Sequence, residues 1–173
     1  SNQNGSATIT VSLSDDGGIS NDGDNTSDSQ TFTITVTAVN DAPSFTKGSD
    51  ITVNEDSGAS STTNWATSIN DGPSNESSQT STFSLSNNNT SLFSSQPAIN
   101  SSGTLTFTPA SNQNGSATIT VSLSDDGGTS NGGDDTSDSQ TFTITVTAVN
   151  DVPSFTKGLD ITVNEDSGSS TAA

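Results

Sequence analysis

The sequence predicts an all-β protein, folded as an antiparallel β-sandwich that repeats in tandem. Three observations support this prediction. Apolar residues alternate with threonine and serine at a period of two, the chain repeats itself after 110 residues, and no segment shows the helical period of 3.6. Threonine is β-branched and suits the solvated face of a sheet, so a hydrophobic content of only 25% does not preclude folding.

The repeat is almost exact in sequence. Residues 1–58 return as 111–168, and only five positions differ: Ile19/Thr129, Asp22/Gly132, Asn25/Asp135, Ala42/Val152 and Ser49/Leu159. A unit of 110 residues is long enough to close its own core, whereas solenoid repeats are much shorter. The period therefore indicates a tandem array of whole domains.

The domain boundaries are set by two short linkers. At 40–43 and at 150–153, a proline follows an acidic turn at the end of a strand pattern. We therefore expect residues 42–151 to form one complete repeat. Residues 1–41 would be the last part of a preceding repeat, and residues 152–173 the first part of a following one.

Short alternating segments, separated by Gly, Asn, Asp and Pro, predict the strands. In chain order they are 7–13, 31–38, 51–53, 65–69, 82–85, 91–93, 104–107, 117–123 and 141–148. The alternation places these apolar residues on the buried face of the first two strands: Ile9, Val11, Leu13, Phe32, Ile34, Val36 and Ala38. Trp65, the only tryptophan, is expected in the core because a tryptophan buries ~200 Å².

Composition excludes several classes of function. The chain has 20 acidic residues against Lys47 and Lys157, a net charge of −18, and neither Cys nor His. Such a polyanion does not bind nucleic acid through phosphates, and it has no disulfides, no ordinary zinc or copper site and no His- or Cys-based catalysis. No apolar run is long enough for membrane insertion, and nothing in the sequence predicts an enzyme. Carboxylate, amide and hydroxyl oxygens remain, and these are ligands for Ca²⁺.

Strand direction predicts where the acidic residues meet. A first strand of about a dozen residues at ~3.3 Å each carries Glu55 to the pole where Asn150 and Asp151 follow the last strand. The strand 117–123 runs the other way and places Asp125 and Asp126 at the opposite pole. Each junction would then gather a Glu from one repeat, two linker oxygens and Asp residues from the next. These carboxylates would repel one another unless a divalent cation lay among them.

Two segments carry a resemblance to a known family. Residues 119–155, with an Asp-Asp-Gly-Gly turn after one strand and Asn-Asp-Val-Pro-Ser-Phe after the next, resemble the closing half of a cadherin repeat. Residues 104–116, with Thr-Phe-Thr-Pro-Ala and Asn-Gly, resemble the bacterial cadherin-like tandem repeats, which have an immunoglobulin-like β-sandwich, of large secreted, RTX-type adhesins. That resemblance implies calcium at the domain junctions.

The resemblance also implies a ligand set. The expected calcium ligands are Asn40, Asp41, Glu55, Asp71, Asp125, Asp126, Asn150, Asp151 and Glu165. One departure concerns Ser111-Asn112-Gln113-Asn114, which stands where cadherins have Asp-Arg-Glu. The loss of these carboxylates predicts weaker binding or fewer ions.

The expected function is a structural extender repeat of an extracellular bacterial adhesin or surface fibre, which calcium stiffens and whose partners are neighbouring repeats. Two alternatives stay open: a repeat that itself binds polysaccharide or a like domain, and a filament subunit that assembles by strand complementation. A plainer interpretation also stays open for the acidic turns, since Asp and Asn favour turns and keep a β-protein soluble. For Asp134, Asp135 and Asp138 the two interpretations are equally supported.

Overall fold

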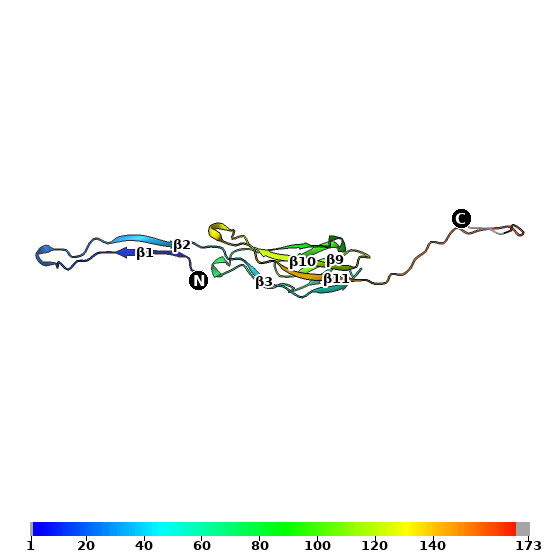
Figure 1. The fold of residues 1–173 in the computed structure, drawn as a ribbon, viewed down its shortest axis with the longest axis horizontal. Helices are drawn as coiled ribbons and strands as arrows, with labels where there is room; N and C mark the ends of the chain where they lie inside the picture. Colours follow the sequence, from blue (N-terminus) through cyan, green and yellow to red (C-terminus); the bar gives the residue numbers. More distant parts are fainter. Residues whose placement is uncertain (1, 169–173) are drawn as a thin grey trace.

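The fold is that of a computed structural model, which describes residues 2–168. Ser1 and residues 169–173, at the outer ends of the two expected partial repeats, lie outside the described residues. Within residues 2–168, every regular element is a β-strand apart from four single turns of 3₁₀ helix. The all-β prediction is confirmed. Figure 1 shows an elongated molecule with a hairpin at one end, a sandwich in the middle and an extended tail at the other end.

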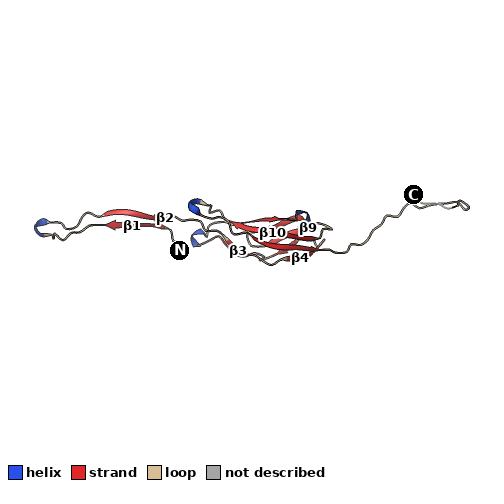
Figure 2. Cartoon of the chain, viewed as in Figure 1, coloured by secondary structure: helices blue, strands red, loops and turns tan. Residues whose placement is uncertain are grey.

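The elements follow one another in this order: β1 (Gly5–Val11), η1 (Ser20–Asp22), β2 (Gln30–Val36), β3 (Ser44–Thr46), β4 (Ile51–Asn54), β5 (Ser60–Thr62), β6 (Thr67–Asn70), η2 (Ser74–Glu76), β7 (Thr82–Asn87), η3 (Thr90–Leu92), β8 (Phe93–Ile99), β9 (Leu105–Pro109), β10 (Gly115–Ser124), η4 (Ser130–Gly132) and β11 (Gln140–Thr147). Figure 2 shows that strands make up nearly all of the regular structure, with only short helical turns beside them.

The sandwich has two layers with one core between them. The first layer is the four-stranded sheet β4-β11-β10-β7, and the second combines the sheets β3-β6 and β5-β9-β8. Alternate residues of β10 and β11 point inward and are buried: Ala117, Ile119, Val121, Leu123, Phe142, Ile144 and Val146. Trp65 packs on Phe142 with ring centroids 4.2 Å apart, which joins the layers and confirms its predicted core position.

The predicted strands find most of the elements and miss three of them, β3, β5 and β8. Residues 91–93 are not a strand, because Thr90–Leu92 form η3 and the strand β8 begins only at Phe93. Strand β8 contains Pro97 and has irregular register with β9, so its sequence lacks the alternation that signals a strand. Three-residue strands such as β3 and β5 are too short to show a period.

The first strand of the complete repeat is divided between the two layers. Strand β3 pairs antiparallel with β6, and β4 pairs parallel with β11. Between them the backbone passes over Trp65, whose Nε1 donates to the carbonyl of Ser49 at 2.9 Å. At Gly48 a Cβ would lie 2.6 Å from the Trp65 carbonyl oxygen, so only glycine fits this passage. The parallel pairing of β4 and β11 places the start and the end of the repeat at opposite poles.

The hairpin β1–β2 stands apart from the sandwich. Its strands pair from Gly5↔Val36 to Val11↔Gln30, in the same register as β10 and β11. The expected burial of its apolar residues is wrong for this chain, since Leu13 is 75% exposed and Phe32 53% exposed. The reason is physical: no second layer covers this hairpin among the described residues. Residues 148–168 form no strand, and their apolar side chains are exposed as well.

Candidate metal centre

The linker that enters the sandwich is held by the side chain of Asn40. Its Nδ2 donates to Asp125 Oδ1 at 3.0 Å and to the carbonyl of Asp134 at 2.7 Å, while its Oδ1 accepts from Gln79 Nε2 at 2.7 Å. The Asp134 backbone N–H also donates to the Asn40 carbonyl at 3.1 Å. One amide side chain therefore connects the linker to two parts of the loop between β10 and β11, at Asp125 and at Asp134, and to the loop before β7.

The next residue of the linker reaches a buried carboxylate. The backbone N–H of Asp41 donates to Glu76 Oε1 at 3.2 Å. Glu76 ends η2 and is only 5% exposed. Gly72 makes this burial possible, since its φ is +137° and a Cβ there would lie 1.9 Å from Glu76 Oε2. The Asn-Asp-Gly stretch at 70–72 thus makes room for a carboxylate beneath the linker.

Four buried oxygens around this linker have no hydrogen-bond partner: Asp71 Oδ1, Glu76 Oε2, Gln79 Oε1 and Asp125 Oδ2. Three of them belong to carboxylates. The only ion pair among the described residues joins Lys157 to Asp160 in the tail, so no lysine compensates this cluster. A buried carboxylate oxygen without a partner costs several kcal/mol unless a proton or a cation satisfies it.

The chemistry of these atoms fits a hard cation. All four are carboxylate or amide oxygens, the donors that Ca²⁺ takes in sets of six to eight. Within residues 2–168, no three acidic side chains form a metal-binding group by themselves. A cation here would therefore need the Gln79 amide oxygen, backbone carbonyls or water to complete its shell. The donors surround the linker, so an ion bound to them would tie the linker to the top of the sandwich.

The predicted ligands of the first junction separate into two groups. Asp71 and Asp125 contribute unpartnered oxygens and Asn40 hydrogen-bonds to Asp125, whereas the exposed Asp41 reaches the group only through its backbone N–H. Asp126 is directed elsewhere: its carboxylate accepts from the Thr80 backbone N–H at 2.9 Å and from Thr80 Oγ1 at 3.0 Å. These two hydrogen bonds, the backbone one first, lower the pKa of Asp126 below its ordinary value of 3.8. The Asp126 side chain therefore binds the loop before β7.

The other predicted ligands lie at the opposite pole and in the tail. Glu55 is buried, and its Oε1 accepts from the Val149 backbone N–H at 2.8 Å, immediately before Asn150 and Asp151. The predicted placement of Glu55 beside the second linker therefore agrees with the structure. Asn150, Asp151 and Glu165 are exposed. In the described part of the chain, no sandwich follows this linker to contribute further oxygens.

Sequence reasoning missed Glu76 and Gln79. Both lie in the irregular segment between β6 and β7, where no periodicity distinguishes a buried side chain from an exposed one. A Glu in a loop rich in serine and asparagine looks like a solvated charge. The only available signal was the Gly-Pro pair directly after Asp71, which indicates a tight turn in which a neighbouring side chain can approach the backbone.

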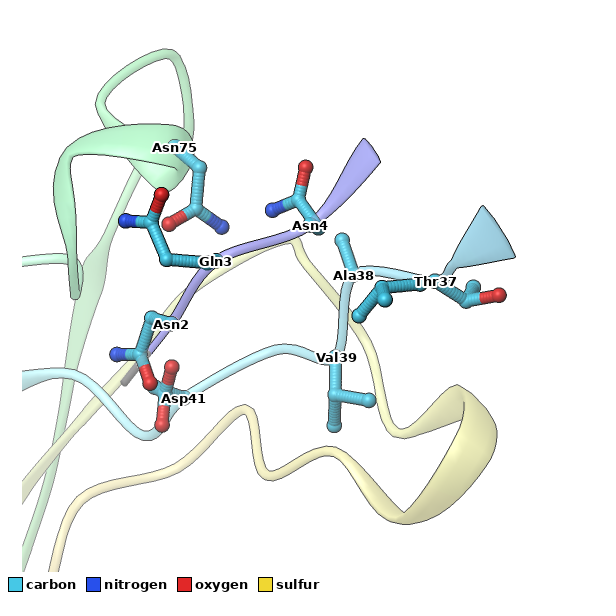
Figure 3. A pocket seen from close by; sticks show the side chains of 9 residues that line it. Asn2, Gln3, Asn4, Thr37, Ala38, Val39, Asp41 and Asn75 are labelled. Carbon is cyan, nitrogen blue, oxygen red and sulfur yellow. The ribbon is translucent and has the colours of Figure 1, made fainter. Parts of the chain in front are cut away.

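A polar pocket continues the site toward the hairpin. It is lined by Asn2, Gln3 and Asn4, by residues 36–39, and by Asp41 and Asn75. Figure 3 shows that the amide side chains of Gln3 and Asn75 lie side by side, with Asn2 close to Asp41. The segment 1–4 is the counterpart of 111–114, where the resemblance led us to expect weaker ligands. Its amides do lie beside the linker.

Neither the profiles of protein families nor the curated protein sequences contain a match to this chain. The described helical turns include none with the length and apolarity needed to span a bilayer.

Proposed function

We propose that this chain is part of an extracellular structural array, in which cadherin-like repeats extend a bacterial adhesin or surface fibre and calcium stiffens the junctions. The observation that supports it best is the group of four unpartnered buried oxygens around the linker. The motif resemblance over residues 104–155 supports the family, and the charge of −18 supports a cation-dependent protein.

Topology supports the extender role independently of the metal. Because β4 and β11 are parallel, the chain enters the repeat at one pole and leaves it at the other. From Thr37 to Pro43 the linker spans only about 20 Å at ~3.3 Å per residue. Figure 1 shows the hairpin β1–β2 beyond the pole at which this linker enters the sandwich. This arrangement supports repeats that follow one another end to end.

Calcium would act on the angle between repeats. Asp71, Glu76, Gln79 and Asp125 belong to the sandwich, whereas Asn40 and Asp41 belong to the linker that leads to the preceding repeat. In this proposal the ion supplies positive charge to buried carboxylates that otherwise repel one another. With that charge present, Asp41 and Glu76 hold the linker in one orientation, and a flexible string becomes a rod.

Calorimetric titration of the 173-residue chain with CaCl₂, after removal of divalent ions, tests the metal. We expect saturable binding, and a melting temperature that rises with calcium concentration. Glu76→Gln keeps the size of the side chain and removes one ligand charge, and it should weaken binding at least tenfold. Asp28→Asn makes the same charge change in an exposed loop of the hairpin and should leave binding unchanged.

Small-angle scattering of a polypeptide of several repeats tests the mechanical role. With calcium, the maximum dimension should grow in proportion to the number of repeats, and with chelator it should fall below that line. If the titration with CaCl₂ gives no saturable heat of binding and calcium leaves the melting temperature unchanged, the metal proposal is wrong. If calcium binds but the dimensions stay the same, the site stabilises a repeat without stiffening the array.

A further inference from the structure

Three of the four side chains that have an unpartnered buried oxygen within residues 2–168 share a second feature: their other polar atom contacts the linker. Asp125 Oδ1 accepts from Asn40 Nδ2, while Asp125 Oδ2 has no partner. Gln79 Nε2 donates to Asn40 Oδ1, while Gln79 Oε1 has no partner. Glu76 Oε1 accepts from the Asp41 backbone N–H, while Glu76 Oε2 has no partner. Each of these side chains therefore binds the linker with one atom and presents the other to the site.

The orientation of the Asn40 amide follows from its neighbours. Its Nδ2 lies 3.0 Å from Asp125 Oδ1 and 2.7 Å from the carbonyl oxygen of Asp134, and both of these oxygens only accept hydrogen bonds at neutral pH. The Asn40 Oδ1 therefore faces Gln79, which has to donate with its Nε2 across 2.7 Å. The oxygen of Gln79 is then the atom that remains for a cation. One linker amide thus determines which end of Gln79 faces the site.

The sandwich holds Asn40 closely enough for it to orient other groups. The Asp134 N–H donates to the Asn40 carbonyl at 3.1 Å, and a Cβ at Gly127 would lie 2.0 Å from Asn40 Oδ1. Because carboxylates and amides are planar, a hydrogen bond that fixes one of their two polar atoms also fixes the direction of the other. Loss of a group that orients a metal ligand in this way typically lowers metal affinity by about 10–100-fold.

The linker also forms one wall of a hollow that borders the site. The lining of this hollow includes Ala38, Val39 and Asn40 from the linker, and Glu76 and Gln79 from the sandwich. When the linker leaves, water replaces this wall and hydrogen-bonds to Glu76 and Gln79. The two side chains then reorient, and a cation has to order them against their conformational entropy. A docked linker has already ordered them.

We propose that Asn40 is a positioning residue rather than a calcium ligand, and that docking of the linker raises the calcium affinity of the site. This inference rests on the proposed calcium function and adds its regulation. Because coupling between two binding equilibria is reciprocal, calcium favours the docked linker by the same factor by which docking favours calcium. Tension that draws the linker away from the sandwich therefore lowers the affinity of the site for its ion.

One substitution distinguishes a positioning residue from a ligand. Asn40→Asp keeps Oδ1, adds a negative charge, and replaces the donor Nδ2 by an oxygen that faces Asp125 and the Asp134 carbonyl. If Asn40 were a ligand, the added charge would tighten calcium binding. As a positioning residue it loses both donated hydrogen bonds, so titration calorimetry with CaCl₂ should show roughly tenfold weaker binding. Equal or tighter binding would overturn the proposal.

Two further variants isolate the effect of the amide. Asn40→Ala removes it without adding charge and should weaken calcium binding about as much as Asn40→Asp. Asn25→Asp makes the same change of residue in the loop between β1 and β2, where the second copy of the repeat already has Asp135 with the same contact to the next threonine. It should bind calcium like the unchanged chain. Melting curves in chelator show that the sandwich remains folded in each variant.

The outcomes separate this proposal from the proposed function. If the unchanged chain binds no calcium, both are wrong. If it binds calcium and the two Asn40 variants bind it equally well, the calcium function stands and the positioning role is wrong. If Asn25→Asp weakens binding as much as Asn40→Asp, the effect arises from net charge and the positioning role is also wrong.

Hydrogen exchange of the unchanged chain, followed by NMR, tests the reciprocal effect without any substitution. The Asp134 N–H donates to the Asn40 carbonyl and the Asp41 N–H to Glu76 Oε1, so both amides report on the docked linker. Replacing chelator by calcium should slow the exchange of both. The Gly17 N–H, which is bonded within its own turn in the hairpin, should exchange at the same rate in both conditions. Unchanged exchange at Asp134 and Asp41 in a chain that binds calcium would contradict the coupling.

Discussion

The hairpins β1–β2 and β10–β11 have the same strand sequences but very different surroundings. Their local structure is the same: both have identical register, and the Ser6–Thr35 hydroxyl contact at 3.2 Å recurs as Ser116–Thr145 at 3.3 Å. Burial differs, because Phe32 is 53% exposed and Phe142 only 2%. Residues 1–41 and their counterparts 111–151 therefore pair their strands in the same way. Burial instead depends on residues 42–110, which cover the strands β10 and β11 but not β1 and β2.

The largest effect should come from removing the same side chain at the two places. Phe142→Ala removes a ring that packs on Trp65 in the core, and it should reduce the free energy of unfolding by about 3–5 kcal/mol. Phe32→Ala removes a half-exposed ring and should cost less than about 1 kcal/mol. Urea unfolding at micromolar concentration measures both. Equal losses would mean that the β1–β2 hairpin is covered in solution.

The comparison also shows which parts of the fold could be predicted from sequence. Alternation located β10 and β11 because their buried residues are all apolar and the residues between them are all polar. The period-two rule could not decide whether Ile9 or Ile119 is buried, since both have the same neighbours in sequence. That difference arises from contacts across the sandwich. It could be anticipated only from the domain boundaries.

The effect of calcium on the free energy of unfolding should also depend on residues of the sandwich and not on their counterparts in the hairpin β1–β2. In the sandwich, Asp125 has one oxygen bonded to Asn40 and the other buried without a partner. With calcium at 100 times its dissociation constant, binding should add ~2.7 kcal/mol to the free energy of unfolding, and Asp125→Asn should lose most of this gain. Asp15 is the counterpart in the hairpin, with the same turn contact to Gly17, and Asp15→Asn should keep the gain.

Thermal unfolding with calcium and with chelator measures this difference. If Asp125→Asn and Asp15→Asn respond equally to calcium, the site does not lie at the linker. In chelator, Asp125→Asn should be no less stable than the unchanged chain, because the substitution removes a charge from a group of unpaired carboxylates.

For the candidate site, sequence reasoning succeeded where topology determines position. Strand direction alone placed Asp125 at the pole where Asn40 enters, and Glu55 at the pole where Asn150 leaves. It could not distinguish Asp125 from Asp126, which are adjacent but point to different partners, Asn40 and Thr80. Side-chain direction in a turn depends on the backbone angles of that turn, and no periodicity in the sequence reports them.

A smaller difference in stability is expected between alanine substitutions at the equivalent glycines Gly127 and Gly17, each in an Asp-Gly turn. At Gly127 a Cβ would lie 2.0 Å from Asn40 Oδ1 and 2.4 Å from Gln79 Nε2, so Gly127→Ala should displace the linker and cost about 1–3 kcal/mol. At Gly17 the nearest atom is Asp15 Oδ1 at 3.2 Å, within the same turn. Gly17→Ala should therefore cost clearly less. Thermal unfolding of the two variants measures the difference, and equal losses would show that the linker contact contributes nothing.

The smallest effect concerns the pH dependence of Asp126. The hydrogen bonds from Thr80 stabilise the ionised carboxylate in the folded chain and lower its pKa. The associated stability is therefore fully present above the ordinary pKa of 3.8, and it is lost as the pH falls through the lower pKa of the folded state. Carbon-detected NMR titration of the Asp126 carboxyl should give a midpoint below 3.8. Thr80→Val removes the hydroxyl donor but keeps the backbone donor, so the midpoint should move only part of the way back. An unchanged midpoint in Thr80→Val would mean that the hydroxyl does not contribute.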